Sequence, residues 1–332
     1  MLIEAVENYY RELSAERNSK PQNWHRASSL GYCPRRLGYQ KLGVVGDPLT
    51  PRRLSIFHHG DAIDLAIKQD LYHALKGEII TANHRGSVEI EGVEISGECD
   101  GFFHIDGRYG VVDGKTMSDF GFERALNGQI EESYQVQGWV YSQIYGVDLV
   151  VFYCYRKETS HIVEVIFDAR VPETIITRRF GGDEREIATK DPLLIAEVRT
   201  PFSPGIEAKA RATVVAVNAV TCEADLPGRI EKNDRGEPII QAETVKVQGA
   251  GGADAYQDAN PGHINTGKAG SWYTFETGRR IAGFPCSYCP FIRRCRSAVL
   301  EVKGGKPVWL VNGKEGLFSG DTQQEVTAGA LG

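Results

Sequence analysis

Apolar residues recur along this chain with two periods, one typical of helices and the other of strands. Ile63, Ile67 and Leu71 are spaced as on the buried face of an amphipathic helix. Apolar and polar residues alternate over residues 149–155 and 161–167, and this period of two predicts a pair of strands. The pattern as a whole therefore predicts an α/β fold that combines helices with a sheet.

The clearest turn signal lies between two further strand-like segments, residues 97–105 and 108–116. Asp106 and Gly107 separate them, and this dipeptide favours a type I′ turn because both central positions of such a turn need a positive φ. Counting outward from the turn gives the expected cross-strand pairs: Ile105 with Arg108, Phe102 with Val111, Asp100 with Asp113, and Glu98 with Lys115. We therefore expect both aspartates, the glutamate and the lysine on the same side of a hairpin.

Two opposed aspartates on one side of a hairpin indicate a metal site. Their Cβ atoms would lie about 4.5–5.5 Å apart, so Asp100 and Asp113 would repel each other without a cation between them. Mg²⁺ is usually held by one or two carboxylates together with waters and phosphate oxygens, and Lys115 would share the face and reach an attacking water or a phosphate. The segment predicts a metal-dependent phosphodiesterase site, with a solvated polar face as the alternative.

Four of the seven cysteines form a second candidate site. Cys286, Cys289 and Cys295 follow a C-x2-C-x5-C spacing, and Cys33 stands alone near the other end of the chain. Four thiolates suit a tetrahedral zinc or an iron–sulfur cluster. Disulfides are the alternative, but the charged N-terminal segment lacks the apolar region of a secretory signal, so we expect a reducing, cytoplasmic compartment. The remaining cysteines are expected to be small core residues: Cys99, Cys154 and Cys222.

Overall charge gives little indication of a nucleic-acid partner, because the formal net charge is −6. Arginines nevertheless gather near the two cysteine segments and at the start of the predicted helix: Arg35, Arg36, Arg52, Arg53, Arg279, Arg280, Arg293, Arg294 and Arg296. If the cysteines join both ends of the chain, these arginines would converge and attract a phosphate backbone. Each pair considered alone is more typical of a solvated surface. No run is apolar enough to span a membrane.

Six motifs in a fixed order resemble one known family. They are Cys33, the helix from Gly60 to Asp64, Asp100, the triplet from Asp113 to Lys115, the Gln137–Tyr141 helix, and the three later cysteines. In this order the chain resembles a RecB-like nuclease of the PD-(D/E)xK superfamily, in the branch with an iron–sulfur cluster. That branch includes CRISPR-associated RecB-type exonucleases, their phage relatives and the AddB nuclease domain.

The resemblance implies a restriction-endonuclease-like core, with a central mixed sheet flanked by helices and a helical iron–sulfur subdomain joining the two ends of the chain. It also implies Mg²⁺ or Mn²⁺ held by Asp64, Asp100 and Asp113, with Lys115 acting on the attacking water. Gln137 would orient the catalytic groups and Tyr141 would touch the DNA backbone. A departure concerns Asp64, which stands where the family has a histidine, and His59 is the alternative ligand.

The implied activity is metal-dependent hydrolysis of DNA, most often from single-stranded ends. The alternative is a non-cleaving DNA-binding subunit of a processing complex, and protein partners are compatible with either. The cysteines Cys33, Cys286, Cys289 and Cys295 would hold a structural 4Fe-4S cluster, or zinc, with no redox step.

The expected organisation follows from these motifs and from composition. Residues 173–198 are expected to be helical, and the Gly-, Ala- and Asn-rich stretch after residue 200 to be a partly mobile insertion. The predicted segments are an N-terminal helical part at 1–60, the nuclease core at 61–200, the insertion at 201–270, the cluster-binding part at 271–308 and a disordered tail at 309–332.

Overall fold

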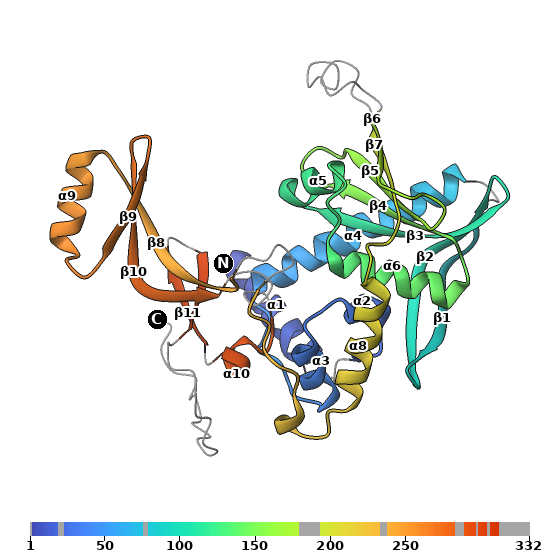
Figure 1. Cartoon of the computed structure of the whole chain (residues 1–332), viewed down its shortest axis with the longest axis horizontal. Coiled ribbons are helices and arrows are strands. Elements are labelled where there is room, and N and C mark those ends of the chain that lie inside the picture. Colours follow the sequence, from blue (N-terminus) through green and yellow to red (C-terminus); the bar gives the residue numbers. More distant parts are fainter. Residues whose placement is uncertain are drawn as a thin grey trace. The chain divides into compact units, whose positions relative to one another are not determined.

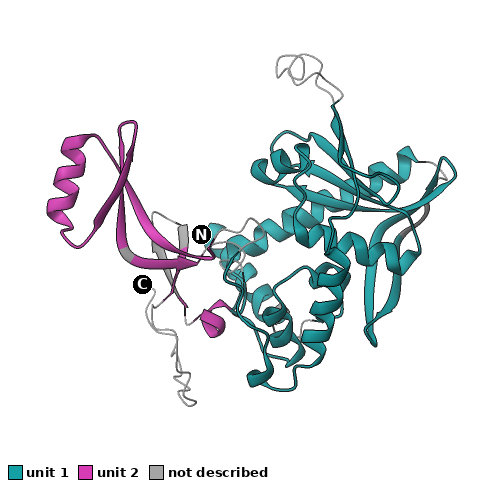
Figure 2. Ribbon diagram, in the orientation of Figure 1, with its two compact units in different colours: residues 1–237, 289–291 teal, residues 238–288, 292–332 magenta. Residues whose placement is uncertain are grey.

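The structure, a computed structural model, divides the chain into two compact units (Figure 2). Unit 1 comprises residues 1–237 and 289–291, and unit 2 comprises residues 238–288 and 292–332. The residues that the structure describes are 2–18, 23–75, 79–178, 193–232, 238–282, 289–296, 298–303 and 306–311. Cys286 and most of the predicted tail, residues 312–332, lie outside these ranges.

Unit 1 contains a seven-stranded sheet (Figure 1), built from β1 (Ile79–Ile90), β2 (Val93–Ile105), β3 (Arg108–Met117), β4 (Leu149–Arg156), β5 (Ile162–Asp168), β6 (Ile175–Arg178) and β7 (Leu194–Thr200). The strand order is β1-β2-β3-β4-β5-β7-β6. The pairs β3/β4 and β5/β7 are parallel, and the other neighbours are antiparallel. The predicted mixed sheet is confirmed, including the strand pair expected at residues 149–167.

Helices accompany this sheet in unit 1: α1 (Leu2–Asn18), α2 (Ala27–Leu30), α3 (Pro34–Lys41), α4 (Pro51–Ala74), α5 (Asp119–Leu126), α6 (Glu132–Tyr145) and α8 (Ile206–Asn218). A short 3₁₀ helix, η1, follows at Glu223–Asp225. The start of α4 is fixed by Thr50, whose side chain accepts a hydrogen bond from the Arg53 backbone N–H, and by Pro51 in the first turn. The end of α6 is fixed by Gly146, which adopts the left-handed conformation at φ 63°.

The helices α4 and α6 pack on opposite faces of the sheet. Leu71 of α4 packs against the buried cluster that contains Val112 of β3, whereas Val140 of α6 belongs to the same buried cluster as the adjacent Val111. Successive side chains of a strand point to opposite faces, so these two contacts define two layers around β3. The amphipathic helix predicted around residues 63–71 is thus confirmed as part of α4, with Ile67 buried and Leu71 packed against the core.

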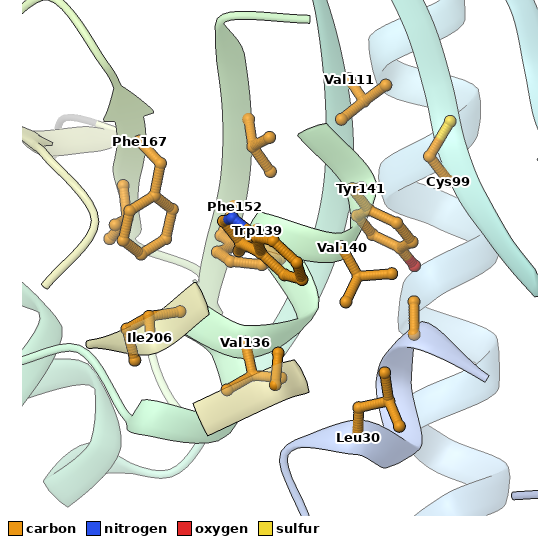
Figure 3. Packing of buried hydrophobic residues seen from close by; sticks show 14 of the residues in the cluster. Leu30, Cys99, Val111, Val136, Trp139, Val140, Tyr141, Phe152, Phe167 and Ile206 are labelled. Atoms are coloured by element: carbon orange, nitrogen blue, oxygen red, sulfur yellow. The ribbon is translucent and has the colours of Figure 1, made fainter. Parts of the chain in front are cut away.

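The larger core lies between the sheet, α6 and α8. Figure 3 shows Val140 and Tyr141 of α6 beside Val111 and Cys99 of the sheet, and Ile206 of α8 belongs to the same cluster. The 201–270 segment therefore contributes a core helix to unit 1, and its later part folds in unit 2.

The hairpin between β2 and β3 has the predicted turn. Asp106 and Gly107 have φ values of 51° and 74°, as a type I′ turn requires. The predicted pairs Ile105 with Arg108 and Phe102 with Val111 are both present: the ladder contains Ile105↔Arg108 and Phe102↔Val111.

The two outer pairs predicted for this hairpin are wrong. The β2/β3 ladder ends at Gly101 and Val112, before the positions of Asp100 and Asp113. Beyond this point Glu98 pairs with Arg85 of β1, while Lys115 pairs with Cys154 of β4. The two strands therefore separate where the candidate carboxylates begin. The Asp100 carboxylate accepts a hydrogen bond from the Gly114 N–H at 2.7 Å, so a side chain replaces the ladder at this point.

Two further expectations need correction. Residues 173–198 do not form a helix in their described parts, because residues 175–178 and 194–200 are the strands β6 and β7. Buried and partly exposed residues alternate in β7, with Ala196 and Val198 fully buried, which is the period of a strand. Cys222 is exposed rather than a core residue. Cys99 and Cys154 are buried as predicted, and burial raises the pKa values of their thiols to about 11 and about 12.

Unit 2 is a smaller sheet with the strand order β11-β12-β10-β8, to which β9 adds by pairing with β10. Its elements are β8 (Ile240–Gln248), α9 (Ala250–Ala259), β9 (Ile264–Ala269), β10 (Trp272–Ala282), α10 (Ile292–Arg296), β11 (Ala298–Lys303) and β12 (Lys306–Val311). Phe275 of β10 is buried and its ring lies 4.9 Å from that of Tyr256 in α9, so the helix covers one face of the β10 strand. Across the described part of the whole chain, no helix has the length and apolar character needed to cross a membrane.

Candidate active site

Asp113 of β3 lies at the centre of a buried polar cluster. The residue is only 5% exposed. Its Oδ1 atom lies 3.0 Å from the Tyr141 hydroxyl and 3.3 Å from Nε2 of Gln137. Its Oδ2 atom forms an ion pair with the Lys115 ammonium. The helix α6 and the strand β3 thus fix both oxygens of one carboxylate.

Gln137 and Tyr141 lie one turn apart on α6, as their four-residue spacing predicts. Gln137 donates a hydrogen bond to the Tyr141 hydroxyl at 2.8 Å, and this hydroxyl also lies 2.9 Å from the Glu98 carbonyl. Tyr141 is 3% exposed. Its hydroxyl helps to hold Asp113, and little of the side chain is exposed for the contact with a DNA backbone that the family resemblance implied.

Lys115 shares a face of β3 with Asp113, because the two residues are two positions apart along the strand. Its ammonium lies 5.3 Å from the ring centroids of both Tyr134 and Phe152, and its side chain is mostly buried. Aromatic faces attract a cation at this distance. The Lys115 side chain is therefore placed at the site beside a carboxylate and two aromatic rings.

The other two candidate carboxylates meet on the opposite face of β3, around Gly114. A Cβ atom placed on Gly114 would lie 3.4 Å from Oδ1 of Asp64 and 3.5 Å from Oδ2 of Asp100. Between these carboxylates lies the Lys68 ammonium, 2.7 Å from Oδ2 of Asp64 and 2.9 Å from Oδ1 of Asp100. Asp64 therefore belongs to the site, although α4 carries it from a distant part of the sequence.

The carboxylates on the two faces influence each other. Burial raises the pKa of the Asp113 carboxyl, Lys115 opposes this shift, and the nearby charge of Asp100 adds to it. Burial raises the pKa of the Tyr141 hydroxyl as well, so the group stays protonated next to Asp113. Burial alone would lower the pKa of Lys68, but its hydrogen bonds to Asp64 and Asp100 outweigh burial and raise it. The cluster thus combines three carboxylates with two ammonium groups.

The donor set suits a hard divalent cation. Carboxylate oxygens are the preferred ligands of Mg²⁺ and Mn²⁺. Oδ2 of Asp113 is buried and is paired with the Lys115 ammonium. The Asp64 and Asp100 carboxylates already enclose a cation, the Lys68 ammonium. Within the described residues, no three His, Cys, Asp or Glu side chains form a ready-made metal cage. A metal ion would therefore need to replace an ammonium group.

The two histidines that precede Asp64 on α4 have surroundings different from those of Asp64. His58 and His59 are exposed, and their rings lie 6.4 Å apart. Asp64 rather than His59 is the side chain that accompanies Asp100.

The cysteine segments are only partly described. Cys33 is the residue directly before α3, at its N-cap position, without a side-chain capping hydrogen bond. Residues 289–291 belong to the same unit. There Phe291 stacks on Tyr39 of α3 at a centroid distance of 5.2 Å, and the Pro290 carbonyl accepts a hydrogen bond from the Asp47 N–H at 2.6 Å. The segment directly after Cys289 thus packs against the element that Cys33 begins. Cys295 lies in α10 of unit 2, and Cys286 is outside the described residues.

Two arginines of the predicted basic surface make contacts within the protein. Arg35 donates to the carbonyls of Leu226 and Pro227, and the guanidinium of Arg36 lies 3.9 Å from the ring centroid of Tyr32. Both guanidinium groups therefore have partners within the protein, which their clustering in the sequence did not indicate.

Sequence reasoning missed Lys68 and a second charged cluster. The signal for Lys68 was its position four residues after Asp64 on one helix. In the second cluster, Asp168 at the end of β5 accepts hydrogen bonds from Arg108 at 2.8 Å and from Arg199 at 3.0 Å. Asp168 is 2% exposed, and the Arg108 hydrogen bonds hold its pKa well below its usual range. Its partners come from β3 and β7, so this cluster ties three strands together.

Comparison with known proteins gives few relatives. No protein-family model matches the chain, and no curated protein matches it. Among solved structures, the match to SSO0001 has 15% sequence identity, covers 68% of this chain and 98% of that chain, and has a TM-score of 0.35. The match to an alkaline exonuclease (LHK-Exo) from Laribacter hongkongensis has 16% identity, covers 63% of this chain and 92% of that chain, and has a TM-score of 0.34. TM-scores and identities this low do not establish a shared fold or function.

Proposed function

We propose that this chain is a divalent-metal-dependent deoxyribonuclease of the PD-(D/E)xK type. The observation that carries the proposal is the buried Asp113, paired with Lys115 on one face of β3 and flanked on the other face by Asp64 and Asp100. A buried carboxylate and a lysine two residues apart, next to further carboxylates, form a group suited to phosphodiester hydrolysis.

The metal ligands in this proposal are Asp64, Asp100 and Asp113, with the Gly114 carbonyl as an additional oxygen. When bound, Mg²⁺ or Mn²⁺ would lower the pKa of a bound water and stabilise the negative charge that develops on the phosphate. The electrostatics of the site support this assignment, because the charges of Asp100 and Asp113 raise the cost of ionising both carboxylates without a cation.

The protein groups have separate tasks. Lys115 holds and orients the attacking water through its ammonium, which Asp113 and two aromatic rings hold in place. Gln137 and Tyr141 are positioning residues, because their contacts fix Oδ1 of Asp113 rather than any exposed surface. The Asp113 carboxylate that would hold the metal is thus oriented before substrate arrives.

The proposed substrate is DNA, and exonuclease action on single-stranded ends follows from the family resemblance. We further propose that Cys33, Cys286, Cys289 and Cys295 hold a structural 4Fe-4S cluster, with zinc as the alternative metal. The packing of Phe291 on Tyr39 supports a link between the two ends of the chain, because it brings the Cys289 segment to the helix that follows Cys33.

The test is an assay of the purified chain on end-labelled linear DNA, single-stranded and double-stranded, with Mn²⁺ or with EDTA. We expect single-stranded DNA to be shortened from its ends in Mn²⁺ and to remain intact in EDTA. A circular single strand of the same length is the control for endonuclease activity. DNA binding without cleavage in any metal would instead favour the non-cleaving subunit.

A further inference from the structure

Lys68 occupies the space between two carboxylates that come from different elements. It projects from α4, as does Asp64 one turn earlier, whereas Asp100 lies on β2. Its ammonium lies 2.7 Å from Asp64 and 2.9 Å from Asp100. One cation therefore bridges two of the three carboxylates assigned to the metal.

This arrangement balances charge in the absence of a metal. Two carboxylates near Gly114, with a third on the other side of β3, would repel one another strongly in a partly buried site. The Lys68 side chain is 23% exposed, and its flexible four-carbon stem can carry the ammonium out to solvent. The Lys115 ammonium does not take this place, since it pairs with Asp113.

We propose that Lys68 is an internal counter-cation that occupies the metal position between Asp64 and Asp100, and that a divalent metal binds by displacing its ammonium. This inference rests on the proposed function, because that function assigns the same carboxylates to the metal. The lysine stabilises the metal-free protein and, by the same contacts, weakens metal binding. Metal occupancy is then set by competition with a side chain of the protein itself.

The experiment compares the wild-type chain with Lys68→Met, which keeps the length of the stem and removes the charge. Binding of Mn²⁺ is measured by titration calorimetry without DNA, and the unfolding temperature is measured with and without Mn²⁺. We expect Lys68→Met to bind Mn²⁺ on the order of tenfold more tightly. We also expect it to melt at a lower temperature without metal and to gain more from Mn²⁺ than the wild type does.

Two further variants serve as controls. Lys209→Met removes an ammonium paired with Glu132 away from the site, and its Mn²⁺ affinity should equal that of the wild type. Lys68→Arg keeps the positive charge and should retain weak Mn²⁺ binding, which tests the idea even if Lys68→Met folds poorly.

The proposal is overturned if Lys68→Met binds Mn²⁺ no more tightly than the wild type, or if Lys68→Arg binds it as tightly as Lys68→Met is expected to. Failure of the proposed function gives a different result. Tighter Mn²⁺ binding by Lys68→Met, with no DNA cleavage by the wild type, would keep the counter-cation and reject the nuclease.

Discussion

The Tyr141 hydroxyl, which reaches Oδ1 of Asp113 from α6, is one of the contacts that orient the Asp113 carboxylate. Tyr141→Phe removes this contact and leaves the Glu98 carbonyl without one partner. We expect cleavage to fall about 10–100-fold, as when an outer partner of a metal ligand is lost. Stability should fall by about 1–3 kcal/mol, the cost of an unsatisfied buried polar group. Cleavage rates in Mn²⁺ and thermal unfolding measure the two effects.

Tyr145 provides a matched control for this prediction. It lies on the same helix, and its hydroxyl reaches the His84 carbonyl at 2.6 Å and the Cys99 N–H at 3.2 Å instead of Asp113. Tyr145→Phe should therefore reduce stability without reducing cleavage per folded molecule. An equal loss of activity in both variants would mean that Tyr141 acts only through stability.

At this scale the sequence predicted which residues share a face better than it predicted the contacts that they make. The spacing of Asp113 and Lys115 places both on one face of a strand, and the spacing of Gln137 and Tyr141 places both on one face of a helix. The burial of Tyr141 could not be predicted, because it depends on how α6 packs on a distant strand pair. Lys68 was missed for the same reason, since one of its two partners comes from β2.

At the scale of elements, the site depends on the close approach of α6 to β2. Gly97 of β2 lies under this helix, and a Cβ atom there would lie 2.8 Å from Ile144 and 2.9 Å from the Tyr141 ring. We expect Gly97→Ala to push α6 outward, to destabilise the chain by about 1–3 kcal/mol and to reduce cleavage by moving Tyr141 from Asp113. Gly228→Ala is the control, because no atom lies within 4 Å of its Cβ position. Wild-type stability and cleavage of Gly97→Ala would contradict this account.

A second element-scale prediction concerns the tie between β3, β5 and β7. Asp168→Ala leaves Arg108 and Arg199 without the carboxylate that they share, and we expect it to cost about 3 kcal/mol at neutral pH. The folded-state pKa of Asp168 is lowered by its Arg108 hydrogen bonds, so its contribution is complete above the unfolded pKa of about 4 and is lost as the pH falls further. Denaturant unfolding at pH 7 and pH 3 should show a smaller difference between variant and wild type at pH 3. A difference that is independent of pH would contradict this assignment.

The sequence predicted individual elements more accurately than their connections. The type I′ turn was readable because its two residues are adjacent, and the buried face of α4 because its period is regular. The point where β2 and β3 separate was not readable, because it depends on the parallel pairing of β3 with β4 across the intervening helices.

At the scale of the whole molecule, the sequence marked residues 201–270 as one insertion, whereas they contribute to both units. Ile206, Ala210 and Val214 are buried at helical spacing in α8, so the periodic signal was present but was obscured by a composition rich in small residues. The proposed cysteine cluster also concerns the whole molecule, because most of the chain separates Cys33 from the later cysteines.

If these cysteines share an iron–sulfur cluster, it closes a very long loop. Losing it should cost about 3–5 kcal/mol by analogy with cross-links over long loops. We expect Cys33→Ala and Cys295→Ala each to lose the visible absorbance of the cluster and to lower the unfolding temperature. Cys222→Ala should do neither, because this exposed thiol lies beside Asp225. Full iron content and stability in Cys33→Ala would reject the shared cluster.

The most direct test of the central claim compares Lys115→Ala and Asp113→Ala with Lys209→Ala on the same end-labelled single-stranded DNA. The account predicts that the two site variants lose Mn²⁺-dependent cleavage while they stay folded and still bind DNA, and that Lys209→Ala cleaves like the wild type. Undiminished cleavage by either site variant would contradict the assignment of Asp113 and Lys115 to phosphodiester hydrolysis.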